Sequence, residues 1–436
     1  MNLITKALLG NGKGIEKKNM RWNMVGSFCY AFASIVLAFL VVRIVGDDQG
    51  GVFGFGFSAF GQQMFTVAYF GIRPFQVTDT IGEYTFKEYY NHRLITCAAA
   101  VLIGAAYLCF LYLRGAYTLD KAAVIFLLVL YKVIDGFADV YESEFQRNGN
   151  LHLTGKSNTF RTILTVFTFL VCLTATRQLL TACAAAVAAQ LLGVVVFDIS
   201  VLRCLDGVDY SARKKSNHAL FHSTLLLFIS VFLDFYIFSS AKYAIDLKLG
   251  NVYSGYFNFI FMPTSVINLV AGFVIRPFLT SLTEFWNHNR FQEFKSQLFQ
   301  IICVILGLTV LAVGGTWLLG RPVLGILESV AGADYAGKLV RYQDSFLIIV
   351  LGGGFYAFLN LMYYGLVIMR KQTQIFVVYI VVTGAAFLVS GAFVGMWGIL
   401  GAALSYLTVM VLLAVGFGLL TFLTYQKGKR EYERQQ

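Results

Sequence analysis

A series of long apolar runs constrains the fold of this 436-residue chain more than any other feature. A run of ~18 or more apolar residues is long enough to cross a bilayer as a helix. We read twelve such spans, at about 23–46, 51–71, 94–113, 122–141, 158–176, 178–202, 219–241, 252–275, 297–319, 343–369, 374–395 and 398–425. Because only 13% of the residues are charged, against ~25% in a soluble domain, much of the apolar surface must face lipid. The chain is therefore predicted to be an all-α integral membrane protein with twelve transmembrane helices.

The positions of the basic residues set the predicted orientation. With the N-terminus inside and the spans alternating, the inner segments hold 24 Lys and Arg residues and the outer segments hold 9. Cytoplasmic loops of membrane proteins carry such an excess, so both termini are predicted to be cytoplasmic. The same bias accounts for the net charge of +11, and no nucleic-acid partner is expected. The basic N-terminal segment lacks the apolar core and cleavage site of a signal peptide.

One short motif occurs twice, at an offset of 203 residues. The two copies are AYFGIRPFQVTD at 68–79 and AGFVIRPFLTSL at 271–282. A single copy is typical of a basic anchor at the interface followed by a helix stop. Two copies, each at the inner end of the second span of its half, predict two six-helix lobes related by a pseudo-twofold axis along the membrane normal, an arrangement known in secondary transporters. The predicted domains are an N-terminal lobe, an inter-lobe cytoplasmic loop and a C-terminal lobe, at 1–205, 206–216 and 217–436.

The two longest inner connections, 72–93 and 276–296, are expected to form short amphipathic surface helices. Each contains a Ser or Thr followed three residues later by Glu, which is the pattern of a capping box at a helix N-terminus. The candidates are Thr85 with Glu88 and Ser281 with Glu284.

Charged residues are densest in the fourth span. Lys132, Asp135 and Asp139 lie at i, i+3 and i+7 on one helical face, and Glu142 continues the face. Charges in hydrocarbon are costly and usually face a wet cavity. One interpretation is a structural Lys132–Asp135 pair with Asp139 at the interface. The other is a cavity wall that titrates or binds a cation.

Lighter polar stripes occur in spans 1, 2, 7 and 8, which are equivalent under the repeat. They comprise Asn23, Ser27 and Ser34, then Ser58, Gln62 and Thr66, then Ser230 and Asp234, and finally Asn258, Ser265 and Asn268. Any one of them is typical of hydrogen bonding between helices. Their concentration in equivalent spans favours a shared central cavity lined by Gln62, Asp234 and Asn268. Arg161 and Asp198 are placed near the inner interface.

Signatures of enzymes are absent from the sequence. There is no phosphate-binding GxxxxGK[ST] loop, so the chain does not itself hydrolyse ATP, and there is no HExxH. The seven cysteines are scattered without a CxxC pair. A membrane-embedded polymerase or acyltransferase typically carries a large outer loop or a catalytic carboxylate–histidine set, whereas the longest outer loop, about 320–342, has no histidine. A non-enzymatic transporter without a cofactor is favoured.

Four stretches carry a resemblance to a known family. They are SEFQRNGNLHLTGKSNTFR, GRPVLGIL, LGGGFYAFLNLMYYGLVIMRKQ and GMWGILGAAL. Together with the two lobes, they resemble the polysaccharide-transporter flippases of the MOP superfamily, and most closely the Firmicute-type members. The resemblance implies a MATE-like fold in the bacterial plasma membrane. It also implies an alternating-access mechanism that moves undecaprenyl-pyrophosphate-linked oligosaccharide or teichoic-acid repeat units from the inner to the outer leaflet. The resemblance implies a protein that works as a monomer in membrane lipid, beside glycosyltransferases and a polymerase or ligase.

The resemblance also implies roles for individual residues. Arg73 and Arg276 are expected to capture the pyrophosphate head at the inner mouth, with Lys132 as the deeper cation. The sequence departs from this pattern because spans 1 and 7 have no central arginine and acidic groups rival basic ones. Asp135, Asp139 or Asp234 is then a candidate for coupling to Na⁺ or H⁺, and Asp135 or Asp139 for the ion site itself. The alternative is a multidrug or organic-cation antiporter of the same superfamily, with Asp135 and Asp139 in an acidic pocket.

Overall fold

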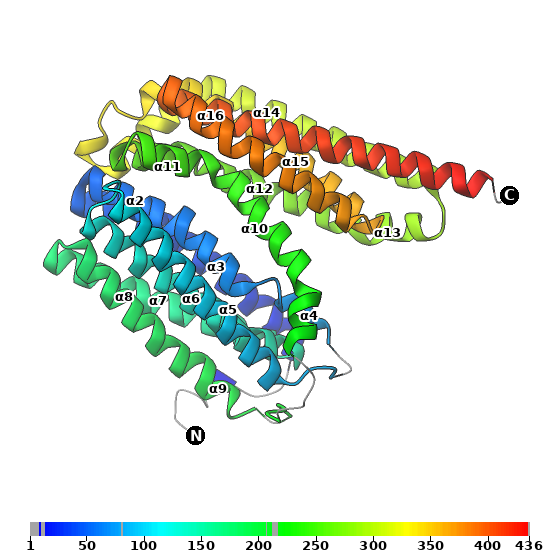
Figure 1. The fold of residues 1–436 in the computed structure, drawn as a ribbon, viewed down its shortest axis with the longest axis horizontal. Coiled ribbons are helices and arrows are strands. Elements are labelled where there is room, and N and C mark those ends of the chain that lie inside the picture. Colours follow the sequence, from blue (N-terminus) through cyan, green and yellow to red (C-terminus); the bar gives the residue numbers. More distant parts are fainter. Residues whose placement is uncertain (1–7, 10–13, 80–81, 206, 212–216, 435–436) are drawn as a thin grey trace. The chain divides into compact units, whose positions relative to one another are not determined.

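The computed structural model describes residues 8–9, 14–79, 82–205, 207–211 and 217–434, and every regular element within these ranges is helical (Figure 1). The chain divides into two compact units, Met1–Phe232 and Leu233–Gln436, referred to below as unit 1 and unit 2. The division falls inside one helix, α10 (Asn217–Lys248). Of the predicted inter-lobe loop, residues 206 and 212–216 lie outside the described part of the chain, as do most of the first thirteen residues and the last two, which belong to the predicted cytoplasmic termini.

Unit 1 contains the helices from α2 to α9 and the first half of α10. Their bounds are α2 (Ile15–Phe55), the π-helical turn η1 (Gly56–Phe60), α3 (Gly61–Tyr69), α4 (Arg73–Thr78), α5 (Phe86–Leu113), α6 (Leu119–Arg147), α7 (Leu151–Thr176), α8 (Leu179–Gly193), η2 (Val194–Ile199) and α9 (Ser200–Leu202). Within this unit α6 packs against α3, α5, α7 and α8, so it is the helix around which the others are arranged.

Unit 2 contains the rest of α10 and the helices that follow. Their bounds are α11 (Asn251–Phe261), α12 (Pro263–Ile275), η3 (Arg276–Phe278), α13 (Leu279–Asn287), α14 (Phe291–Ala331), η4 (Ala333–Tyr335), η5 (Val340–Tyr342), α15 (Gln343–Ile368) and α16 (Gln372–Glu433). Here α15 is central, because it packs against α12, α14 and α16.

Predicted boundaries between spans coincide with backbone breaks. Gly46 has φ 86° inside α2, and Gly398 has φ 58° inside α16. Glycine adopts positive φ without a steric penalty, so each long helix changes direction there. Arg177 has φ 54° and separates α7 from α8. These breaks confirm the predicted divisions after residues 46 and 176 and before residue 398.

Among the described residues, nine helical segments are long and apolar enough to cross a membrane. Two of them, Ile15–Thr78 and Gln372–Glu433, contain the glycine breaks. The charged helix α6 is not one of the nine, although many of its side chains are buried inside unit 1. The chain is thus an all-helical, multi-pass membrane protein, and the count of twelve spans stays a prediction.

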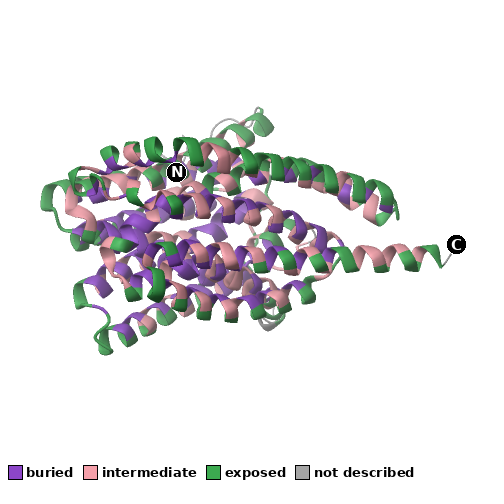
Figure 2. Cartoon of the chain, turned by 90° about the horizontal axis from the view of Figure 1, so that it is seen from above, coloured by how far each residue is buried: buried purple, intermediate pink, exposed green. Residues whose placement is uncertain are grey.

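Exposed residues lie on the outward faces of the helices and buried residues lie between the helices (Figure 2), and many of the exposed side chains are large and apolar. Leu102, Val310 and Phe387, for example, are between 68% and 72% exposed. Such faces are stable in a bilayer because lipid tails are as apolar as leucine.

One of the two predicted capping boxes is present. The Thr85 side chain accepts from the backbone N–H of Glu88, and Glu88 Oε2 accepts from the Thr85 N–H at 2.8 Å. The prediction for Ser281 is wrong, because Ser281 lies inside α13, and its Oγ donates to the Phe278 carbonyl at 3.0 Å. The helical path runs from α12 through η3 into α13, so no free helix N-terminus exists there to be capped.

Helices α2 and α7 approach each other closely at Gly26 and Gly155. A Cβ added at Gly155 would lie 2.7 Å from the backbone nitrogen of Asn23, and one added at Gly26 would lie 2.8 Å from the Gly155 carbonyl oxygen. Small residues at such crossings let helix backbones pack directly in a membrane. The pair therefore fixes how α7 sits against α2.

We expect Gly155→Ala to lower the stability of the protein by ~1–3 kcal/mol, because the added methyl group overpacks a backbone contact. Gly307→Ala is the matched control, since nothing lies within 4 Å of a Cβ at this helical position. The comparison is made by thermal unfolding of both variants in the same detergent. Equal melting temperatures in the two variants would contradict the packing argument.

Candidate functional site

Unit 1 contains a buried network of arginines and carboxylates built around α6. Asp135, Asp139 and Glu142 project from one face of this helix, because residues three or four apart share a face. Asp139 and Glu142 are 5% and 6% exposed. Carboxylates this deep in a protein are stable only when they are paired and hydrogen-bonded.

Arg161 of α7 is the centre of the network. Its Nη1 donates to Asp198 Oδ2 at 2.7 Å. Its Nη2 donates to Asp135 Oδ1 and to Glu142 Oε1, both at 2.8 Å. Ser157 donates to the other oxygen of Asp198 at 2.5 Å. One guanidinium thus ties α6 and α7 to the π-helical turn η2.

Two further arginines bind Asp139. Arg93 of α5 is fully buried, and its Nη2 donates to Asp139 Oδ2 at 2.7 Å while its Nη1 donates to the Tyr69 carbonyl at 2.7 Å. Arg73 pairs with the other oxygen of Asp139 and lies 3.6 Å from Glu142 Oε2. Glu142 therefore contacts both Arg73 and Arg161 and joins the two parts of the network.

The network continues to the end of α6 and the loop after α4. Arg147 Nη2 donates to Asp79 Oδ2 at 3.2 Å, and Arg147 lies 3.6 Å from Glu144. Burial opposes the charge of Asp79, but the backbone amides of Tyr84 and Glu83 and the guanidinium of Arg147 outweigh it and hold its pKa below the ordinary value. The carboxylate of Asp79 thereby fixes the loop against α6.

Lys132 lies apart from this network. Its Nζ donates to Tyr30 Oη at 2.8 Å and lies 3.9 Å from the centre of the Phe57 ring. The expected pair with Asp135 is replaced, because Asp135 accepts from Arg161 and, at 3.3 Å, from Gln190. The buried ammonium is stabilised by a hydroxyl group and an aromatic face.

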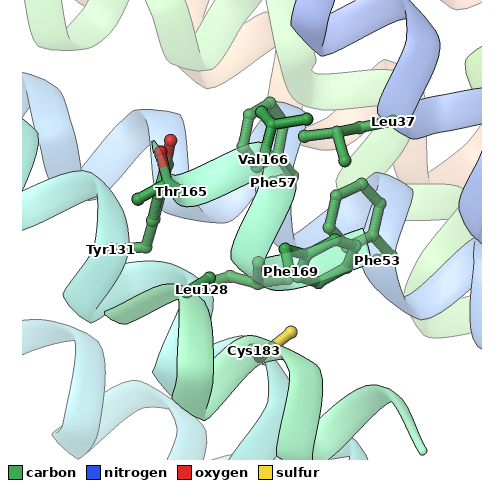
Figure 3. A pocket seen from close by; sticks show the side chains of 10 residues that line it. Leu37, Phe53, Phe57, Leu128, Tyr131, Thr165, Val166, Phe169 and Cys183 are labelled. Carbon is green, nitrogen blue, oxygen red and sulfur yellow. The ribbon is translucent and has the colours of Figure 1, made fainter. Parts of the chain in front are cut away.

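Beside these groups unit 1 contains a small apolar cavity of about 20 Å³ (Figure 3). Phe53, Phe57 and Phe169 form much of its wall, with Tyr131 and Cys183 at its sides. A single water molecule needs ~10–15 Å³, so the cavity has no room for a substrate. This cavity therefore does not provide a substrate-binding site beside the polar groups of unit 1.

Unit 2 contains a larger polar cavity of about 350 Å³ between α12 and α15. Arg276 lies at its edge and is exposed, and Asn268, Asn360, Tyr356 and Tyr364 line it. Asn360 Nδ2 donates to Asn268 Oδ1 at 3.3 Å. Within the described part of the chain, Arg276 makes no ion pair or side-chain hydrogen bond. The cavity thus combines amide and phenol groups with a guanidinium that has no partner among the described residues.

The remaining predicted residues lie elsewhere. Asp234 of α10 is half-buried beside the hydroxyl of Tyr379, and no basic side chain pairs with it among the residues that the structure describes. Gln62 is half-buried on α3, while the adjacent Gln63 is buried and donates to the Phe232 carbonyl at 3.0 Å. The structure therefore brings Asp135, Asp139 and Arg73 together in unit 1, and Asn268 and Arg276 together in unit 2.

Sequence reasoning missed the importance of Arg93, Arg161 and Asp198. Arg93 lies at the end of the predicted inner connection 72–93, and the other two residues are predicted near the inner interface. A signal was present, because Arg161 and Asp198 both occur within apolar runs, where an unpaired charge is costly. An arginine and an aspartate in neighbouring spans indicate a buried pair, although the sequence alone does not say that they meet.

The helical architecture defines an all-α integral membrane protein, and solved structures place it among known folds. An inward-facing multidrug-resistance MATE transporter of the MOP superfamily aligns over 95% of this chain and 98% of its own, with 12% identity and a TM-score of 0.72. The Vibrio cholerae MATE transporter VcmN aligns over 99% of both chains, with 14% identity and a TM-score of 0.59. A MATE transporter solved in complex with MaD5 aligns over 99% and 100%, with 13% identity and a TM-score of 0.58.

No protein-family model and no curated protein matches the sequence. At 12–14% identity, the similarity to solved structures shows the fold. The chain has the fold of the MATE transporters, and the predicted MATE-like fold class is confirmed.

We expect Arg161→Gln to destabilise the protein by ~3–5 kcal/mol, because it removes the cation that pairs with Asp135 and with the buried carboxylates of Glu142 and Asp198. Arg290→Gln is the control, since Arg290 forms an exposed pair with Glu293 at 2.6 Å, and such pairs contribute little. The thermal stability of both variants is measured by heating and fluorescence-detected size-exclusion chromatography. Equal losses in the two variants would mean that the network does not stabilise unit 1.

Proposed function

We propose that this protein is a secondary transporter that flips an anionic lipid-linked oligosaccharide or teichoic-acid repeat unit from the inner to the outer leaflet of a bacterial plasma membrane. The observation that carries the proposal is the polar cavity of unit 2, where Arg276 has no ion-pair partner within the described residues. The MATE fold is consistent with alternating access, in which two lobes rock around a substrate site.

The groups around the cavity suit a pyrophosphate-linked sugar. A guanidinium binds phosphate oxygens in a bidentate manner, which makes Arg276 a natural partner for the pyrophosphate. The amides of Asn268 and Asn360 and the hydroxyls of Tyr356 and Tyr364 can both donate to and accept from sugar hydroxyls. A volume of about 350 Å³ lies within the range of ~300–1,000 Å³ for small-molecule sites.

The two copies of the repeated motif take different roles in this proposal. Arg73 is matched by Asp139 and Glu142 and would have to break these pairs to bind a phosphate. Arg276 has no such pairs within the described residues, so it can bind an anion without that cost. We therefore assign first capture to Arg276 and a structural role to Arg73. With both termini in the cytoplasm, as the basic residues predict, Arg276 lies at the inner end of its span.

We expect Arg276→Ala to reduce glycan flipping by ~10–100-fold, because a hydrogen-bonded charge contributes ~1.5–3 kcal/mol. The assay measures translocation of a fluorescent undecaprenyl-pyrophosphate-linked sugar in proteoliposomes. Arg276→Lys should retain part of the activity, and Arg290→Ala should retain all of it. Full activity in Arg276→Ala with a normal melting temperature would overturn the proposal.

A second candidate function is export of organic cations, as in a multidrug antiporter. It is favoured by the similarity to multidrug-resistance MATE structures and by Asp234, a half-buried carboxylate without a basic partner in the described chain. Transport of a fluorescent organic cation that is lost in Asp234→Asn and unchanged in Arg276→Ala would favour this function. The opposite pattern would favour the flippase.

Asp234 is also our candidate for coupling to Na⁺ or H⁺, in preference to Asp135 and Asp139. The latter two are held by arginines, whereas Asp234 faces a tyrosine hydroxyl. We expect Asp234→Asn to alter the dependence of transport on Na⁺ and pH without a large loss of stability. Asp135→Asn should instead lower the melting temperature. A coupled transporter whose ion dependence is the same in Asp234→Asn would contradict this assignment.

A further inference from the structure

A second cavity of unit 2 is larger than the polar one and has a different character. It has a volume of about 650 Å³ and lies between α14 and α16, with α15 behind it. Its inner part is lined by Leu298, Ile302, Phe358 and Met362, and the glycine Gly418 leaves space on α16. We refer to it as the α14–α16 groove.

The groove is polar at one end and apolar at the other. The start of α14 and the end of α16 lie together, because the Tyr425 hydroxyl donates to the Phe291 carbonyl at 3.2 Å. Lys295, Lys429 and Arg430 therefore gather at the same end of the groove. From Arg430 to Gly418 the groove follows α16 for about 12 residues, or ~18 Å at 1.5 Å per residue. That length is close to one leaflet of hydrocarbon, ~15 Å.

The basic end has an excess of positive charge. Lys429 is paired with Glu433 at 3.4 Å, and Arg430 donates to the uncharged Gln426 at 3.3 Å. Lys295 is exposed and makes no ion pair within the described residues. Three cations thus face one carboxylate, which leaves capacity for an anion.

The groove is separate from the polar cavity that contains Arg276. Tyr356, Asn360 and Tyr364 line that cavity from one face of α15, at i, i+4 and i+8. Phe358 and Met362 line the groove, and a residue two positions along a helix points ~200° away. The two sites therefore lie on opposite faces of α15, and a ligand in the groove does not occupy the proposed cargo site.

The surroundings of the groove indicate a ligand that comes from the membrane. Phe422 at its edge is 57% exposed, and Phe299 on the adjacent surface of α14 is 64% exposed. Both lie on segments that are apolar enough to cross a bilayer. A water-soluble anion would gain nothing from the apolar part of the groove.

We infer that the α14–α16 groove binds an anionic phospholipid of the surrounding membrane, independently of the cargo. The phosphodiester lies among Lys295, Lys429 and Arg430, and one acyl chain lies along Ile302, Met362 and Gly418. Basic pockets between membrane helices bind anionic headgroups in this way. In the predicted orientation, the basic end of the groove faces the cytoplasm, where it can bind anionic lipid of the cytoplasmic leaflet. The bound lipid holds the end of α16 against the start of α14.

The first test compares the thermal stability of the delipidated full chain with and without phosphatidylglycerol. The wild type should gain ~2–4 °C, the shift typical of a modest binding energy in a protein of this size. The triple variant Lys295→Gln, Lys429→Gln, Arg430→Gln should lose this gain and keep its lipid-free melting temperature. Lys427→Gln is the matched control, because Lys427 lies outside the groove lining and is 73% exposed beside Glu431.

Two further comparisons identify the ligand. Glycerol phosphate, which carries the anion without acyl chains, should give no shift, and an equal shift would replace the lipid by a soluble anion. Phosphatidylcholine should give a smaller shift, and an equal one would remove headgroup recognition. An undiminished gain in the triple variant would also overturn the proposal.

A final variant tests the acyl chain. An added side chain at Gly418 starts 3.8 Å from the Phe358 ring, so Gly418→Phe fills the apolar part of the groove without a backbone clash. The variant should fold and lose the stabilisation by phosphatidylglycerol. Mass spectrometry of the lipids that copurify with each variant checks this result, and phosphatidylglycerol retained at the wild-type level in Gly418→Phe would contradict the proposed position of the chain.

Discussion

The guanidinium of Arg161 among three carboxylates is the interaction on which the arrangement of unit 1 depends. Asp135, Glu142 and Asp198 come from α6 and η2, and Arg161 pairs with all three, which offsets the cost of placing their charges inside the protein. Glu142 also pairs with Arg73, and Asp139 pairs with Arg93, so the network of ion pairs extends to α4 and α5. Removing one charge would leave its partners with fewer opposite charges to offset the cost of burial, so the network favours one arrangement of the helices that carry them.

This network changes the meaning of the repeated Arg-Pro-Phe motif. In both copies the motif forms a short helical turn after a membrane helix, as α4 and as η3. In unit 1 the arginine is drawn into the network by Asp139 and Glu142. Unit 2 offers Arg276 no equivalent acids among the described residues, and the arginine borders an open polar cavity. The same local signal therefore yields a structural residue in one half and a candidate binding residue in the other.

Much of the fold was predictable from local features of the sequence. Apolar runs predicted the nine helical segments of the described residues that are long and apolar enough to cross a membrane, and positive-φ positions such as Gly46 and Gly398 divided the long ones where expected. The Thr85–Glu88 cap was predictable because both partners lie within one turn. The site was predictable only in part. Spacing along α6 placed Asp135 and Asp139 on one face, but their partners, Arg161 and Arg93, come from other helices. Pairings between helices depend on packing, which a periodic pattern does not specify.

The most direct measurement is photocrosslinking of a radiolabelled undecaprenyl-pyrophosphate-linked glycan to the full chain in membranes. One crosslinking residue replaces Asn360, which lines the cavity with Arg276, and another replaces Gln146, which accepts from Arg73 at 3.0 Å. Capture of the head by Arg276 predicts a labelled product at position 360 that an excess of unlabelled lipid-linked glycan suppresses, and little product at position 146. Suppressible labelling at position 146 with none at position 360 would contradict it and return the capture role to Arg73.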